Sequence, residues 1–135
     1  MSNIIDNLWL CSWEEVKKMT KLNTNCTLVV NCTVDLPSII ENTINIPIND
    51  DQSNASKLNK YIFNACSKIH TQLENNLPVI CHCLAGVSRS ASVIVCYLII
   101  YHNMDKESAI NFVRSKRPHA LMFLNFEKTF DYISE

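Results

Sequence analysis

Hydrophobic positions along this chain fall into short apolar runs and longer stretches with helical spacing. The short runs, which are typical of strands, occupy residues 4–10, 26–31, 42–48 and 78–83. Between residues 57 and 75, apolar side chains recur every three or four positions, which predicts an amphipathic helix. Residues 91–101 are almost entirely apolar and predict a buried helix. Strands separated by helices indicate an α/β fold, with a single small sheet flanked by helices.

N-capping residues mark two further helices. Ser12 and Glu15 form a capping box, which predicts a short helix over residues 13–19. Asp105 is suited to cap a helix that runs to about Lys116.

Two other segments complete the expected order. Residues 49–56 are polar and predict a loop before the long helix. Pro118 interrupts the helical pattern, and residues 122–134 predict a last helix. The chain has no internal repeat, linker or low-complexity stretch, so residues 1–135 are expected to form one domain.

The segment between the 78–83 strand and the 91–101 helix carries the candidate chemistry. It reads His82-Cys83-Leu84-Ala85-Gly86-Val87-Ser88-Arg89-Ser90. A strand, a short loop and a helix N-terminus in this order direct several N–H groups to one point, where a phosphate-sized dianion fits. Arg89 can add two donors to its oxygens, and Cys83 is expected to ionise readily and attack phosphorus in line. The sequence therefore predicts a phosphate-binding loop between the central strand and a buried helix.

The position of the one glycine supports this prediction. The chain contains only Gly86, where average usage of about 7% would give roughly nine glycines. Elsewhere the chain turns with Asn, which tolerates left-handed backbone. Gly86 lies in the middle of the loop, where a Cβ would obstruct the approach of the backbone to a ligand. This placement indicates function.

Charge and cysteine content limit the classes of partner. The net charge of −1 argues against a nucleic-acid-binding or membrane-binding surface. The seven cysteines are an odd number spread through apolar segments, and no signal peptide is evident, which favours reduced thiols in a cytoplasmic protein. Residues 91–101 are too few to span a bilayer, which takes about 20 residues. The sequence sets no oligomeric state.

The motif His-Cys-x-x-Gly-x-x-Arg-Ser at residues 82–90 resembles that of the cysteine-dependent protein phosphatases, and the wording Leu-Ala-Gly-Val-Ser-Arg-Ser is most similar to the dual-specificity branch. The resemblance extends along nearly the whole chain. It implies hydrolysis of phosphotyrosine and phosphoserine or phosphothreonine in phosphoproteins, through a cysteinyl-phosphate intermediate, without metal or cofactor.

The resemblance also implies a role for each residue of the motif. Cys83 is the expected nucleophile and Arg89 the expected phosphate clamp, while Ser90 bonds the sulfur and helps it leave in the second step. His82 is expected to support the loop. Backbone N–H groups that would bind phosphate belong to Leu84, Ala85, Gly86, Val87, Ser88 and Arg89. Ser88 is also expected to shape the loop through a hydrogen bond.

The general acid is expected in the polar segment after the 42–48 run. Asn49-Asp50-Asp51 resembles the family's general-acid loop. Asp50 directly follows the strand and Asn49, so it is the preferred candidate. Two extra residues before Leu58, relative to common members, keep Asp51 as the alternative.

The chain departs from the family pattern after Arg117-Pro118. There the family usually presents a Pro-Asn pair whose Asn fixes the acid and phosphate loops, whereas this chain has Met122-Phe123, with Asn125 two residues late. The departure leaves open how firmly the acid loop is held.

Two other functions fit parts of the same motif. One is a phosphopeptide-binding module without turnover, and the other is an enzyme for RNA 5′ ends or phosphoinositides. Related enzymes with those substrates tend to carry Lys in or near the loop, and the neutral side chains between Cys83 and Arg89 favour phosphoprotein instead.

Overall fold

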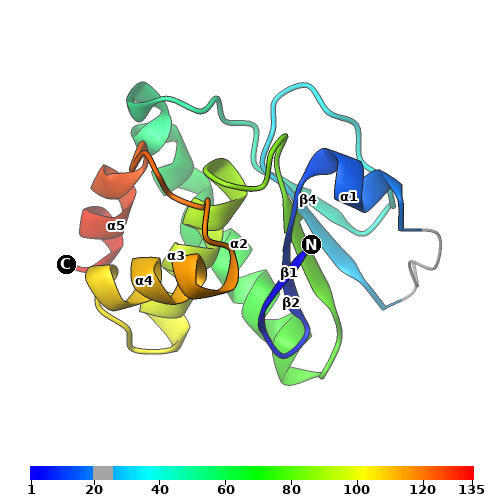
Figure 1. The fold of residues 1–135 in the computed structure, drawn as a ribbon. Coiled ribbons are helices and arrows are strands. Elements are labelled where there is room, and N and C mark those ends of the chain that lie inside the picture. Colours follow the sequence, from blue (N-terminus) through cyan, green and yellow to red (C-terminus); the bar gives the residue numbers. More distant parts are fainter. Residues whose placement is uncertain (20–25) are drawn as a thin grey trace.

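The computed structural model describes residues 1–19 and 26–135. Its elements are β1 (Ser2–Ile5), β2 (Leu8–Cys11), α1 (Trp13–Lys17), β3 (Leu28–Asn31), β4 (Thr43–Asn45), the 3-10 helix η1 (Gln52–Asn54), α2 (Ala55–Glu74), β5 (Val79–His82), α3 (Arg89–Tyr101), α4 (Lys106–Lys116) and α5 (Glu127–Ile133). Figure 1 shows α2 to α5 gathered on one face of the sheet and α1 on the other. In the described part of the chain, no helix has both the length and the apolar character needed to cross a membrane.

The five strands form one mixed sheet in the order β1-β2-β5-β3-β4. β1 runs antiparallel to β2, and the other neighbouring strands are parallel. β5 is therefore the central strand, as predicted. Because parallel strands end at the same edge of a sheet, the residues that follow β2, β3 and β5 come together there, and ligand sites in α/β sheets form at this edge.

Alternating side chains of the strands pack into two hydrophobic cores. Val30 and Cys81 face the larger core beneath α2 to α5, whereas Val29 and Ile80 face a small core with Val16 of α1. Within the larger core, α3 is buried continuously from Ser90 to Leu98, which confirms the predicted buried helix. This helix fixes the position of the loop that precedes it.

Several elements differ from the predictions. The predicted loop over residues 49–56 contains η1 and the start of α2, and α1 and β3 are shorter than predicted. The 4–10 run, expected to form a short pair of edge strands, belongs to the hairpin of β1 and β2, in which only β1 lies at the sheet edge because β2 also pairs with β5. β4 covers only part of the 42–48 run. The last helix begins at Glu127 rather than at 122, since Leu121 adopts a left-handed φ of 61° and its N–H bonds to the carbonyl of Val87. The segment between α4 and α5 thus passes close to the motif loop instead of forming helix.

Candidate active site

Hydrogen bonds from three other segments hold the 83–89 loop from outside. The carbonyl of Leu84 accepts a bond from the Trp13 N–H at 2.9 Å, and the carbonyl of Val87 accepts one from the Leu121 N–H at 2.7 Å. Between them, the carbonyl of Ala85 accepts a bond from Nη2 of Arg117 at 3.3 Å. Since these carbonyls are bonded on the outside of the loop, its N–H groups are left for the inside.

Gly86 allows the loop to pack against the end of β2. Its φ is +70°, a left-handed conformation that L residues avoid. A Cβ at this position would lie only 2.5 Å from the carbonyl oxygen of Cys11, which is backbone and cannot rotate away. The one glycine of the chain is therefore required both by its conformation and by its neighbour.

Cys83 lies directly after β5, at the base of the loop. Its side chain is buried, and its Sγ lies 3.1 Å from Oγ of Ser90, in the first turn of α3. The Ser90 hydroxyl is suited to donate a hydrogen bond to a sulfur that carries negative charge. Ser88, rather than Ser90, is the N-cap residue of α3, and its side chain makes no capping bond.

Arg89 is the first residue of α3, and its side chain lines a pocket at the carboxyl edge of the sheet. Nη1 donates to the carbonyl of Ile48 at 3.2 Å, which fixes one end of the guanidinium. Nε is buried and finds no acceptor among the described residues. A buried donor without an acceptor is costly, so this geometry suits an anion whose oxygens complete the bonding of the guanidinium.

His82 supports the loop from within the protein. The side chain is fully buried, and its ring lies 5.5 Å from the ring of Trp13. Burial lowers the pKa of the imidazole, an effect opposed by the hydrogen bond to the carbonyl of Cys83, where Nδ1 lies 3.4 Å from the oxygen. Burial thus favours the neutral imidazole, and the contact of His82 with Cys83 is this one with the backbone carbonyl.

Asp50 is bonded directly to the motif loop. Its Oδ1 accepts a hydrogen bond from Oγ of Ser88 at 2.6 Å and another from Nδ2 of Asn125 at 3.0 Å. Ser88 thus joins the motif loop to the preferred candidate for the general acid. Because both bonds end on Oδ1, Oδ2 is the oxygen suited to carry a proton.

Asp51 has a different set of partners. It precedes η1, and its Oδ1 accepts hydrogen bonds from the Ser53 hydroxyl and, at 2.9 Å, from Nδ2 of Asn54. These bonds, that of Ser53 first, hold the pKa of Asp51 below its usual value. A carboxyl whose ionised form is favoured is a poor proton donor, and Asp51 does not line the pocket that contains Arg89 and Asp50.

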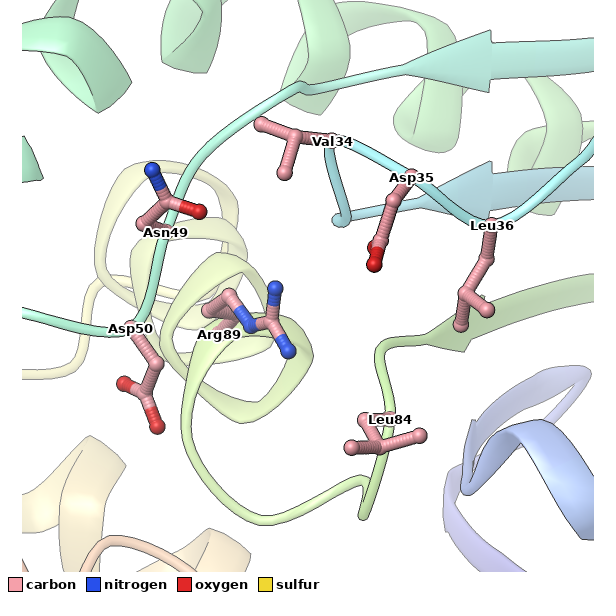
Figure 2. A pocket seen from close by; sticks show the side chains of 7 residues that line it. All are labelled: Val34, Asp35, Leu36, Asn49, Asp50, Leu84 and Arg89. Carbon is pink, nitrogen blue, oxygen red and sulfur yellow. The ribbon is translucent and has the colours of Figure 1, made fainter.

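Arg89 and Asp50 line one hollow of about 280 Å³ at the carboxyl edge of the sheet. Figure 2 shows the guanidinium of Arg89 between Asp50 on one side and Asp35 on the other, with Leu84 at the start of the loop. Cys83 and Ser90 lie at the base of the same loop. In the described residues, no three His, Cys, Asp or Glu side chains form a cluster that could hold a metal ion.

Asn125 and Arg117 bond to the segment that contains Asp50 and to the 83–89 loop, and the sequence did not predict either contact. Asn125 donates to both the side chain and the carbonyl of Asp50, the latter at 3.4 Å, so the acid loop is tied down although the Pro-Asn pair is missing. Arg117 bonds Ala85 and also forms an ion pair with Glu15 at 2.9 Å. The sequence shows Asn125 two residues after the usual position of the family's Asn. Its contact with Asp50 depends on the path of the 118–126 segment, which the sequence does not give.

Comparisons with known proteins agree with this geometry. The family model for the catalytic domain of dual specificity phosphatases matches residues 8–132. Dual specificity protein phosphatase 14 of Mus musculus is 31% identical over 113 residues, which are 81% of this chain and 56% of the relative. Dual specificity protein phosphatase H1 of Variola virus is 30% identical over 112 residues, covering 81% of this chain and 63% of the relative.

The crystal structure of human DUSP28 has the same fold, with a TM-score of 0.87 and 21% identity over 98% of this chain and 91% of that one. The chain spans about half the length of the first curated relatives that it matches. Because the family model covers nearly all of its residues, the chain belongs to the dual specificity phosphatase family.

Proposed function

We propose that this protein hydrolyses phosphotyrosine and phosphoserine or phosphothreonine in phosphoproteins. The observation that carries the proposal is the arrangement of three groups at one loop: a buried thiol at its base, a guanidinium at its end whose buried Nε has no acceptor among the described residues, and a carboxyl hydrogen-bonded to Ser88 of the loop. Phosphoryl transfer needs a nucleophile, stabilisation of charge on the phosphate oxygens and a proton for the leaving oxygen, and these groups can supply them.

In the first step, the thiolate of Cys83 attacks phosphorus and the bond from phosphorus to the substrate oxygen breaks. Asp50 gives its proton to that oxygen, so a neutral alcohol or phenol leaves. Arg89 and the loop N–H groups bind the phosphate oxygens throughout.

In the second step, water attacks the cysteinyl phosphate and gives a proton to Asp50, while the sulfur–phosphorus bond breaks. Ser90 donates a hydrogen bond to the departing sulfur, which stabilises the regenerated thiolate. The products are inorganic phosphate and the free enzyme, so the cycle needs no metal or cofactor.

The lining of the pocket supports phosphoprotein over the other substrates. Of the residues that line the hollow around Arg89, Arg89 is the one basic residue, whereas Asp35 and Asp50 are acidic. The lining therefore offers no second cation for the additional phosphates of an RNA 5′ end or an inositol phosphate, and the Asp35 carboxylate would repel them. Free thiols at all seven cysteines suit a reducing compartment such as the cytoplasm.

The test is turnover of four substrates by the wild-type chain and by Cys83→Ser: a phosphotyrosine peptide, a phosphothreonine peptide, a phosphoinositide and 5′-triphosphate RNA. We expect the wild-type chain to release phosphate from both peptides and Cys83→Ser to release none while still binding them. Peptide binding without release by the wild-type chain would indicate a binding module instead. Faster release from the lipid or the RNA would reassign the substrate class.

A further inference from the structure

A second, smaller hollow adjoins the phosphate pocket on the side of the 118–126 segment. Its volume is about 160 Å³, smaller than the roughly 300–1,000 Å³ of pockets that bind whole ligands, so it suits a single side chain. Asp50 lines both hollows, which makes them neighbours. The residues that line the second hollow are Asp50, Val87, Ser88, His119, Met122, Phe123 and Asn125.

Two large apolar side chains at this hollow are exposed. Met122 is 71% exposed and Phe123 is 74% exposed, more than any other large hydrophobic residue that the structure describes. Single exposed apolar residues are common on protein surfaces, but here two consecutive ones lie beside a phosphate pocket. An apolar side chain placed on them would bury area on both partners.

The backbone on both sides of this pair is fixed. Before it, the N–H of Leu121 bonds to the loop carbonyl of Val87, and the guanidinium of Arg114 bonds to the carbonyl of Leu121. After it, Asn125 is bonded to Asp50 and Phe126 is fully buried. Figure 1 shows this segment between α4 and α5. The backbone around Met122 and Phe123 is therefore held in place before a ligand binds, so binding has to order only their side chains, which favours binding.

We propose that Met122 and Phe123 form a subsite for an apolar side chain of the substrate, within two positions of the phosphorylated residue. The inference rests on the proposed function, since the phosphorylated residue must occupy the neighbouring pocket. Residues of an extended peptide advance about 3.3–3.6 Å each, so only a near neighbour of the phosphorylated residue reaches an adjoining hollow. The subsite would select phosphoproteins by sequence.

The test uses phosphotyrosine peptides that carry Leu, Ala or Asp at each of the two positions before and after the phosphotyrosine. The value of kcat/KM is measured with the wild-type chain, and Kd is measured with Cys83→Ser. We expect the best Leu peptide to exceed its Ala counterpart by about tenfold, both in kcat/KM and in affinity. This factor corresponds to partial burial of the leucine side chain.

The variant M122S/F123S should reduce this Leu-to-Ala ratio to near one, because it removes the apolar contact. The matched control is Phe63→Ser, which removes another exposed aromatic residue, 50% exposed, that packs on Tyr132 and lines neither hollow. The control should keep the ratio of the wild-type chain. All three positions are exposed, so the variants are expected to fold.

The outcomes separate this proposal from the proposed function. Turnover with no Leu preference would overturn the subsite alone, whereas a Leu preference in Kd without turnover would overturn the phosphatase activity alone. Equal loss of the ratio in Phe63→Ser would place the subsite elsewhere and overturn it. If M122S/F123S kept the ratio but lost binding to phosphatidylcholine–phosphatidylserine vesicles, the pair would be a membrane contact, and the proposal would be wrong.

Discussion

The phosphate loop and the acid loop of this protein are held in different ways. The phosphate loop is bonded through its carbonyls, by two backbone N–H groups and Arg117, and its glycine packs directly on the end of β2. The acid loop is held mainly by the side chains of Ser88, Arg89 and Asn125, two of which bond to Asp50 itself. In the proposed mechanism, binding of phosphate thus depends on backbone geometry, whereas delivery of the proton depends on a few side chains that single substitutions can remove.

Among variants that keep Cys83, the largest effect is expected at the acid. Asp50→Ala should lower turnover of a phosphothreonine peptide by about 10²–10⁴-fold, the usual range for general acid catalysis. The loss should be smaller for phosphotyrosine and smallest for nitrophenyl phosphate, because better leaving groups need the proton less. The pH–rate profile should also lose the limb that requires a protonated carboxyl.

Asp51→Ala is the matched control for this prediction. The Asp51 carboxylate is bonded to Ser53 and Asn54 rather than directed at the pocket, so its loss should change neither the order of the substrates nor the profile. If the two variants exchanged these behaviours, Asp51 would be the acid. If neither showed a graded loss, the acid would lie outside this loop.

Arg89→Lys should lower kcat by about 10²–10³-fold on every substrate, the cost of removing one transition-state donor in comparable sites. A lysine ammonium cannot provide the planar pair of donors, and it has no group at the position of Nε. Unlike Asp50→Ala, the loss should not depend on the leaving group. Kinetics on phosphotyrosine and nitrophenyl phosphate would check this, and a graded loss would argue that Arg89 acts through the acid loop instead.

Gly86→Ala tests how much of the phosphate loop is backbone geometry. The left-handed φ of an L residue costs about 1–2 kcal/mol, and the new Cβ would also displace the loop from the Cys11 carbonyl. We therefore expect reduced stability in urea and weaker inhibition by inorganic phosphate. Asn76→Ala, at a left-handed position with φ 57° outside the site, should lose stability without changing phosphate inhibition. If phosphate inhibited Gly86→Ala and Asn76→Ala equally, the packing of Gly86 on Cys11 would not be needed for phosphate binding.

Asn125→Ala should have the smallest effect. Removing its bonds to Asp50 should slow phosphothreonine turnover about threefold to tenfold, in line with a net worth of about 0.5–1.5 kcal/mol for such a bond. Ser53→Ala removes a bond to Asp51 instead and should leave turnover unchanged. Rates on phosphothreonine and nitrophenyl phosphate would show whether Asn125 acts through Asp50. An equal loss on both substrates would mean that it does not.

The sequence predicted the parts of the site that depend on neighbouring residues, and the family resemblance pointed to Asp50, but the side-chain contacts between distant segments could not be read from either. Cys83, Gly86 and Arg89 lie within one strand–loop–helix unit, whose local geometry follows from their spacing. The contact of Asn125 with Asp50 joins residues 75 positions apart, and it depends on the non-helical path of the segment between α4 and α5, which includes the left-handed Leu121. Spacing alone therefore indicated a missing Pro-Asn pair, although Asn125 reaches the acid loop by another route.

The order of folding during synthesis follows from where the outer bonds of the pocket originate. Arg117, Leu121 and Asn125 all lie in the last fifth of the chain, yet they bond the phosphate loop and the acid loop. Synthesis proceeds from the N-terminus, so Cys83 and Arg89 emerge from the ribosome before the residues that organise their surroundings. A nascent or truncated chain that ends before residue 117 therefore carries the proposed nucleophile without the bonds that hold the two loops, and the proposed activity is expected only once the C-terminal segment is present.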